Sequence, residues 1–115
     1  MLKNNFLLEM SEDGDELVIG MSGELDHHGA VRVRAQIDER ISELRPKRAI
    51  MLLSGIDFMD SSGLGLIMGR YAKMKAVGGE LVLRAPSERM LKIIRLGGLD
   101  RIVTIELAEG EDDKK

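Results

Sequence analysis

Apolar and polar residues alternate in blocks along the chain, and the first blocks indicate strands. Apolar runs at residues 6–10 and 17–21 are separated by a polar stretch that contains Asp13 and Gly14. An Asp-Gly dipeptide between two strand-like runs is a strong signal for a tight hairpin turn. The pattern therefore predicts that the chain opens with an antiparallel hairpin.

Helical spacing of apolar residues follows in three segments. A one-sided helix is predicted over residues 30–44. A second helix is predicted to begin near Ser61 and to stop at the glycines 78–79, where a left-handed residue is easily accommodated. A third is expected to begin at Ser87, a natural N-cap residue, and to end at the glycines 97–98.

Short apolar runs between these helices predict the remaining strands, at residues 49–53, 81–83 and 102–107. The first run is continuous, as is typical of a strand covered on both faces. Because strands separated by helices need crossover connections, we expect an α/β fold. The sheet is predicted to be mainly parallel, with the N-terminal antiparallel hairpin at one side and the helices packed on it. One domain over residues 1–107 and a charged, disordered tail over 108–115 complete the prediction.

Composition narrows the class of protein. A chain of 115 residues with 43% apolar side chains has room for one domain. It has no apolar stretch long enough to cross a membrane and no signal-peptide pattern, so we expect a cytoplasmic protein without a membrane partner. A net charge of −3 and few aromatic residues argue against a nucleic-acid partner. The absence of cysteine excludes disulfides and thiolate sites, and the lack of exposed apolar runs favours a monomer.

The segment that carries candidate chemistry is residues 58–65, Phe-Met-Asp-Ser-Ser-Gly-Leu-Gly, between a predicted strand and the second helix. Ligand and partner sites of α/β folds lie at the carboxyl ends of parallel strands. Either Asp60 or Ser61 can cap the helix, and the N–H groups of its first turn suit anionic oxygens. A phosphate on Ser61 is expected to be tolerated there, although the same residues also make an ordinary helix start.

Glycines set this helix apart from an ordinary one. Gly63, Gly65 and Gly69 each weaken a helix by about 1 kcal/mol relative to alanine, so we expect close approach of another group. Their spacing misses the dinucleotide-binding pattern by one residue. Ser61 and Ser62 do not lie in a Gly-x-Ser-x-Gly elbow. A small nucleotide-binding or hydrolytic protein that uses this turn nevertheless remains the alternative hypothesis.

A second notable stretch, residues 23–29, follows the second strand and carries Asp26, His27 and His28. Adjacent histidines are a weak signal for a metal site, and two side chains in sequence project in different directions. We expect neither a metal nor another cofactor. Ionisable groups in a loop beside the second-helix loop suit recognition by another protein.

At these two stretches the sequence resembles the STAS-domain anti-sigma factor antagonists, and among them the sporulation members. The resemblance rests on residues 23–28 and 58–65, supported by residues 69–71 and 78–80. The order of elements also fits from about residue 6 to 107. The resemblance implies a regulator of transcription through a sigma factor, not an enzyme.

The resemblance also implies roles for individual residues. Ser61 corresponds to the serine that is phosphorylated by an anti-sigma factor, which is a protein serine kinase. The unphosphorylated antagonist binds this kinase and frees the sigma factor, and a PP2C-type phosphatase removes the phosphate. Asp26 is expected on the surface that meets the kinase, together with Asp60, Ser62 and Gly63.

Two departures from the family pattern stand out. Leu52 occupies a position near the end of the central strand where related proteins often have an acidic or amide residue. The chain also continues past residue 107 with a short charged sequence, whereas the family commonly has a further helix there. The polar surroundings of the phosphoserine and the contacts of that helix are therefore expected to differ.

Overall fold

The computed structural model describes residues 6–108. The predicted order of strands and helices is confirmed, with one short 3-10 helix in addition. The predicted tail lies outside the described residues, apart from Ala108. The elements are β1 Leu7–Asp13, β2 Glu16–Leu25, α1 His27–Leu44, β3 Arg48–Met59, α2 Ser61–Ala76, β4 Glu80–Arg84, α3 Glu88–Leu96, the 3-10 helix Leu99–Arg101 and β5 Thr104–Glu106.

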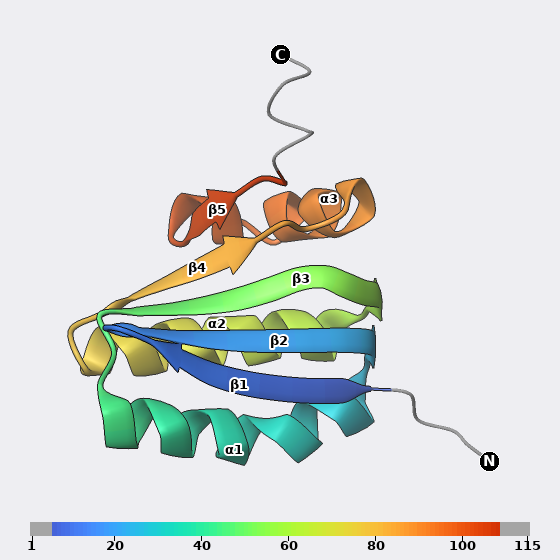
Figure 1. Cartoon of the computed structure of the whole chain (residues 1–115). Helices are drawn as coiled ribbons and strands as arrows, with labels where there is room; N and C mark the ends of the chain where they lie inside the picture. The colour runs from blue at the N-terminus through green and yellow to red at the C-terminus, as the bar shows by residue number, and fades with distance from the viewer. Residues whose placement is uncertain (1–5, 109–115) are drawn as a thin grey trace.

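The strands form one sheet in the order β1-β2-β3-β4-β5 (Figure 1). β1 pairs with β2 in the antiparallel sense, and all later pairs are parallel. The opening hairpin is confirmed, and Gly14 in its turn has a φ of 63° that favours glycine. The α/β architecture and mixed sheet are therefore as the hydrophobic pattern predicts.

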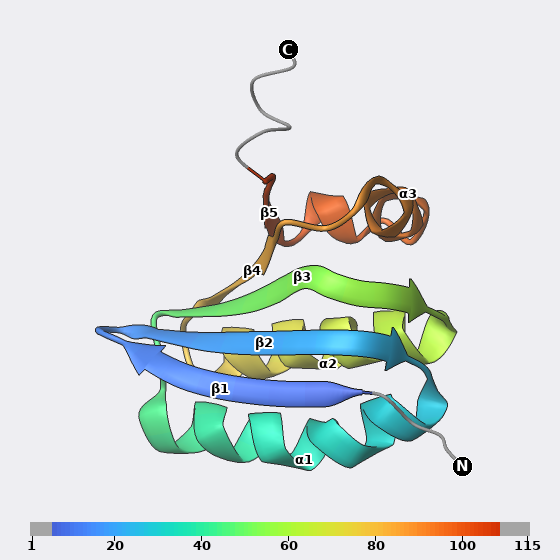
Figure 2. The same ribbon diagram turned by 45° about the vertical axis from the view of Figure 1, so that its right-hand side comes forward.

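Helices α1 and α2 lie side by side on one face of the sheet, and α3 lies beside β4 and β5 (Figures 1 and 2). Their inward residues pack against the alternate residues of β2, β3 and β4 that point to that face. Among the fully buried members of this core are Leu17, Ile19, Ile37, Ile41, Met51, Leu53, Ile67, Met74, Leu81 and Leu83. In residues 6–108 no helix is both long and apolar enough to span a membrane.

Charged side chains cover the central strands on the opposite face. Arg48 on β3 donates from Nη1 to Glu16 on β2 over 2.8 Å and from Nη2 to Glu106 on β5 over 2.9 Å. Ile50 and Val82 lie on this same face by strand alternation, yet both are fully buried. The predicted cover on both faces of β3 is therefore present, with helices on one face and the ion pairs of Arg48 on the other.

Several element boundaries differ from the prediction, and three of them bear on the site or on the end of the sheet. α1 begins at His27 and not at residue 30, because Asp26 caps it. β5 begins at Thr104, since residues 99–101 form the 3-10 helix that the sequence pattern did not reveal. β3 continues to Met59, well past the predicted end at residue 53.

The extension of β3 includes two register shifts against β2, one of them between Gly20 and Ser22. At each shift β3 has one residue more than β2, which makes a β-bulge. The bulges let the polar segment of β3 stay paired with β2. Gly55 permits the first one, because a Cβ there would lie 2.8 Å from Cβ of Ser22 and 2.9 Å from the carbonyl oxygen of Met21. The bulged extension carries β3 to the same edge as the end of β2.

The ion-pair network predicts how stability responds to acid. The hydrogen bond from Arg84 lowers the pKa of Glu106, and the charges of Arg84 and Arg48 lower it further. A carboxyl whose pKa is lower in the folded chain than in the unfolded chain stabilises the fold above its unfolded pKa. That stabilisation is lost as the pH falls through the folded pKa.

We expect Glu106→Gln to reduce the free energy of unfolding by about 1 kcal/mol at neutral pH, because the paired side chains are partly exposed. The difference from wild type should shrink below about pH 4 and disappear once the carboxyl is protonated. Urea unfolding of both proteins across this pH range measures this difference in the free energy of unfolding. A deficit that stays constant down to pH values near 2 to 3 would show that the charge of Glu106 is not responsible.

Candidate functional site

The ends of β2 and β3 bring the two candidate loops together. Leu25 and Met59 are partners in the parallel register, and Asp26 and Asp60 are the next residues on their strands. The backbone N–H of Asp60 donates to the carbonyl oxygen of Leu25 over 3.4 Å. The expectation that the loop after the second strand lies beside the second-helix loop is thus confirmed.

Each of the two aspartates caps a helix. Oδ1 of Asp26 accepts a hydrogen bond from the N–H of Gly29 at the start of α1 over 3.0 Å. Oδ1 of Asp60 accepts from the N–H groups of Ser62 over 2.8 Å and Gly63 over 3.4 Å at the start of α2. Of the two caps that the sequence allowed, the structure has Asp60.

This choice leaves the side chain of Ser61 free. Ser61 is exposed, and its hydroxyl has no hydrogen-bond partner among the described residues. The N–H groups of Ser62 and Gly63 are already occupied by Asp60. The expectation that the first turn of this helix offers free N–H groups to an anion is therefore wrong for these two residues.

The surroundings of Ser61 are acidic. The hydrogen bond from Gly29 lowers the pKa of Asp26, and the nearby His28 lowers it further. Asp57 is exposed on the extension of β3 that leads to Ser61, and Glu24 is exposed near the end of β2. A phosphate on Ser61 would thus join an edge that already carries several carboxylates.

The glycines of α2 have different roles. Gly63 is buried, and a Cβ there would collide with the side chain of Met59 and lie 3.2 Å from Cγ of Leu25. The expected close approach of another group is therefore confirmed at Gly63. At Gly65 and Gly69 a Cβ would meet no atom within 4 Å, so close approach inside the chain is wrong for these two.

Two residues that belong to the stretches carrying the resemblance, but to which the sequence analysis assigned no role, lie in this region. Phe58 is 44% exposed although it is a large apolar residue two positions before Asp60. Arg70 on α2 is only 5% exposed. The bulge in β3 reverses the side-chain alternation near Phe58. Arg70 lies at helical spacing from the buried residues 66, 67 and 74, so the period of the helix could have indicated its burial.

The histidines lie on the first turn of α1, and their ring centroids are 6.0 Å apart. No hydrogen bond within residues 6–108 joins either imidazole to the hydroxyl of Ser61 or Ser62. In the same part of the chain, no three residues of the His, Cys, Asp and Glu types are placed to hold a metal ion. Among the described residues, neither histidine is therefore in hydrogen-bond contact with a candidate serine.

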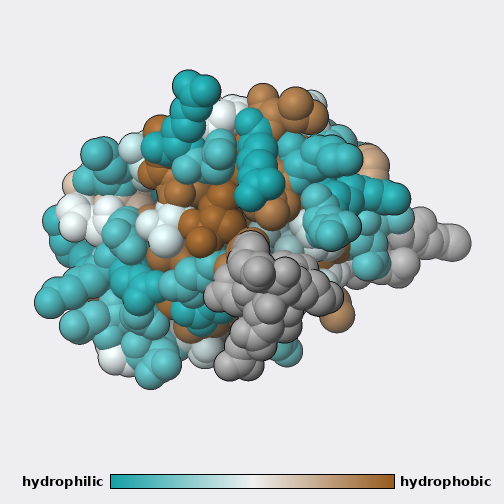
Figure 3. Space-filling model, turned by 90° about the horizontal axis from the view of Figure 1, so that it is seen from above, coloured by the Kyte–Doolittle hydropathy of each residue, from teal (hydrophilic) through white to brown (hydrophobic). Residues whose placement is uncertain are grey.

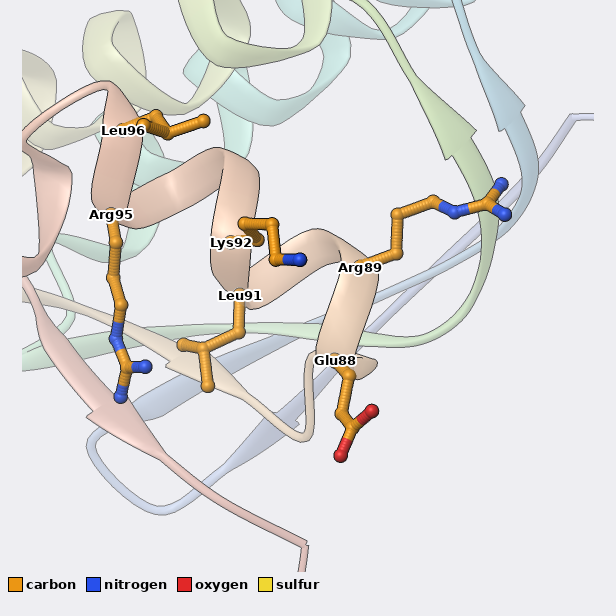
Figure 4. A pocket seen from close by; sticks show the side chains of 6 residues that line it. All are labelled: Glu88, Arg89, Leu91, Lys92, Arg95 and Leu96. Carbon is orange, nitrogen blue, oxygen red and sulfur yellow. The ribbon is translucent and has the colours of Figure 1, made fainter.

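A hollow of about 860 Å³ lies elsewhere, along the outer face of α3 (Figure 4). Its long side chains diverge: Arg89 and Arg95 point away from each other, and Leu96 is 84% exposed. Seen from the side of α3 and β5, apolar surface lies between hydrophilic side chains (Figure 3). Side chains that do not converge on a point suit a contact surface better than a small-molecule site.

Comparison with known proteins gives consistent matches over the whole described fold. The family model of the STAS domain matches residues 8–112. An anti-sigma F factor antagonist of Lysinibacillus sphaericus is 41% identical over 83% of this chain and 80% of its own length. One from Paenibacillus polymyxa is 37% identical over 88% of this chain and 86% of its own length.

Solved structures agree with these sequence matches. The chain is similar to the anti-sigma factor antagonist SpoIIAA in its unphosphorylated form, with a TM-score of 0.71 and 35% identity over 94% of this chain and 93% of that one. It is also similar to the phosphorylated form of the Bacillus cell fate determinant SpoIIAA, with a TM-score of 0.69 and 36% identity over 95% of this chain and 97% of that one. The predicted fold family is confirmed.

The capping geometry predicts different stabilities for the variants Asp60→Ala and Ser61→Ala. Asp60→Ala removes the acceptor of two N–H groups and should reduce the free energy of unfolding by about 1 kcal/mol. Ser61→Ala should change it by less than about 0.5 kcal/mol, because this side chain caps nothing. Thermal and urea unfolding measure both. A larger loss for Ser61→Ala than for Asp60→Ala would contradict the assignment of the cap.

Proposed function

Since the chain belongs to the STAS-domain family of anti-sigma factor antagonists, we propose that it is a phosphorylation switch with Ser61 as the acceptor. The unphosphorylated chain binds an anti-sigma factor that is also a serine kinase, and this binding releases the sigma factor. Phosphorylation of Ser61 ends the binding, and a PP2C-type phosphatase restores it. The chain itself catalyses nothing.

The exposed, unpaired hydroxyl of Ser61 is the observation that carries this proposal. A kinase must bring the γ-phosphate of its nucleotide in line with the attacking oxygen. The hydroxyl of Ser61 needs no rearrangement for this, because Asp60 performs the capping. Ser62 is only partly exposed and faces the side of α2 nearest α1, so it is a neighbour and not the acceptor.

Electrostatics supports the direction of the switch. A phosphoserine adds close to two negative charges at neutral pH to an edge that already holds Asp26 and Asp60. In a kinase complex this group would face the nucleotide phosphates at the site of transfer, and like charges repel. The phosphorylated chain should therefore leave the kinase that modified it.

The partner surface is proposed to follow the residues around Ser61. Asp26 and Asp60 lie beside it on adjacent strand ends, and the exposed ring of Phe58 adds apolar area. Ser62 would contribute the exposed part of its side chain to this surface. Gly63 is buried, so it would contribute through the packing that holds the loop in place. We propose that the free chain is a monomer in the cytoplasm, with residues 1–107 as its functional domain.

No observation favours the alternative of a nucleotide-binding or hydrolytic protein. The turn at Gly63 is filled by Met59 and Leu25, so its backbone is not open to a pyrophosphate. The first-turn N–H groups that would hold a phosphate are occupied by Asp60. The similar proteins described above are anti-sigma factor antagonists, which are regulators.

Phosphorylation by the anti-sigma factor kinase should place one phosphate on Ser61. Tandem mass spectrometry after incubation with the kinase and ATP locates it. Ser62→Ala is the matched control, because it changes the adjacent hydroxyl and should still be phosphorylated, whereas Ser61→Ala should not. A phosphate on Ser62 or Ser87 in the wild type would refute the assignment.

Binding to the kinase should separate two Ser61 variants. Ser61→Ala should bind as tightly as the unphosphorylated wild type, because it loses a hydroxyl without an intramolecular partner. Ser61→Asp should bind about tenfold more weakly, since it adds one charge to the acidic edge. Titration calorimetry, together with thermal melts that show all three proteins to be folded, measures this. Equal affinities in all three would contradict the switch.

A further inference from the structure

The outer face of α3 carries two rows of side chains (Figure 4). One row contains Arg89, Lys92 and Leu96, and the other contains Glu88, Leu91 and Arg95. Neighbours within a row are three or four residues apart and therefore lie one above the other on the helix surface. When two helices pack, rows of this kind are the ridges that fit into the grooves of the other helix. The outer face of α3 thus has the relief on which a second helix packs.

Apolar surface belongs to both rows. Leu96 is 84% exposed, and Leu91 is partly exposed. The buried Met90 and Ile94 attach the other side of α3 to the core, so the two leucines are not required for that attachment. A single exposed leucine is ordinary on a protein surface. Two leucines on one helix face among cationic side chains instead resemble the apolar centre and polar rim of a protein interface.

The cations of this face have no partner in the described part of the chain. Arg89, Lys92 and Arg95 are exposed, and none of them forms an ion pair or a side-chain hydrogen bond within residues 6–108. Glu88 lies one turn before Lys92, yet these two side chains are not paired either. The face therefore holds three positive charges and one negative charge that are available to a molecule outside the chain.

The sign and the extent of this charge indicate the kind of partner. The positive charge is confined to one helix of about 14 Å, whereas the chain as a whole has a net charge of −3. A membrane or a nucleic acid presents a continuous negative surface, which would also meet acidic parts of the chain and be repelled by them. An acidic helix of another protein matches the length and the charge of α3 alone.

We propose that the outer face of α3 docks an acidic amphipathic helix of a partner protein. Apolar side chains of the partner helix cover Leu91 and Leu96, as in other complexes in which a helix lies in an apolar groove. Its carboxylates pair with Arg89, Lys92 and Arg95, and the two guanidinium groups can each bind a carboxylate through two hydrogen bonds. This surface is separate from the residues around Ser61, so the proposal does not rest on the phosphorylation switch.

The test is an NMR titration of the isotope-labelled full chain with a synthetic helical peptide at constant ionic strength. The peptide is alanine-based, has about 18 residues so that it is helical alone, and carries leucines on one face flanked by glutamates. Amide signals of α3 should shift and saturate. A second peptide with lysine in place of every glutamate should produce no saturable shift. Equal saturation by the lysine peptide would overturn the acidic partner, and no saturation by the glutamate peptide would overturn the docking surface.

Charge reversal on α3 locates the binding. The double variant Arg89→Glu with Lys92→Glu should bind the glutamate peptide at least about tenfold more weakly and should gain binding of the lysine peptide. It should melt close to wild type, because both positions are exposed and a negative charge is favourable in the first turn of a helix. Leu96→Ser should weaken binding of the glutamate peptide about fivefold, since it removes apolar contact area.

The matched control reverses two exposed cations on the other helices. Arg34→Glu with Lys75→Glu changes the net charge by the same amount on α1 and α2. It should bind the glutamate peptide within about twofold of wild type. A loss as large as that of the α3 double variant would show that net charge and not this face controls binding, and would overturn the proposal.

Two further measurements separate this surface from the switch and from other occupants. Ser61→Ala should bind the glutamate peptide like wild type, whatever its affinity for the kinase, and loss of binding would overturn the separate surface. Vesicles of phosphatidylcholine with phosphatidylglycerol should not sediment the full chain. Sedimentation that the α3 double variant abolishes would assign the face to a membrane and overturn the protein partner.

Discussion

The parallel pairing of the last residues of β2 and β3 determines the geometry of the candidate site. Because Leu25 and Met59 are register partners, the two helices that follow them start side by side. Asp26 and Asp60 then cap these helices from equivalent positions. Ser61 is the first residue after the second cap, so the sheet register and the Asp60 cap together fix where its hydroxyl emerges. Every property proposed for the site depends on that placement.

The two sides of the sheet support this edge in different ways. On one side, α1 and α2 pack against an apolar core and hold the starts of both helices in place. On the other side, Arg48 joins β2, β3 and β5 through carboxylates, and Ile50 on this side is also fully buried. The proposed phosphate on Ser61 would be added at the edge of the sheet, outside both arrangements. The fold can therefore remain constant while the charge of the contact surface changes.

Much of the architecture could be predicted from the sequence, because local patterns determine it. The hairpin turn at Gly14, the apolar periodicity of α1 and the capping Ser87 of α3 all lie in short stretches, and each is present in the structure, although α1 begins earlier than expected. The bulged extension of β3 could not be predicted, since Ser54, Gly55 and Asp57 resemble a loop until β2 pairs with them.

The site was predictable to a similar extent. The position of Ser61 at a strand-to-helix junction follows from local pattern, but the choice of Asp60 as the cap depends on rotamer and loop geometry. The helical period of α2 places Arg70 on its buried face, but the pairing of Arg70 with Asp38 depends on how α1 packs against α2, which no single segment encodes. The openness at Gly65 and Gly69 is likewise a property of two helices together.

The claim that phosphorylation changes a surface and not the fold is tested most directly by comparing the backbone amide spectra of the chain before and after stoichiometric modification of Ser61. Our account predicts shifts concentrated at residues 59–66 and at the adjoining start of α1, with the signals of β4, α3 and β5 unchanged. Shifts distributed across the sheet, or loss of the dispersed signals of its core, would contradict it.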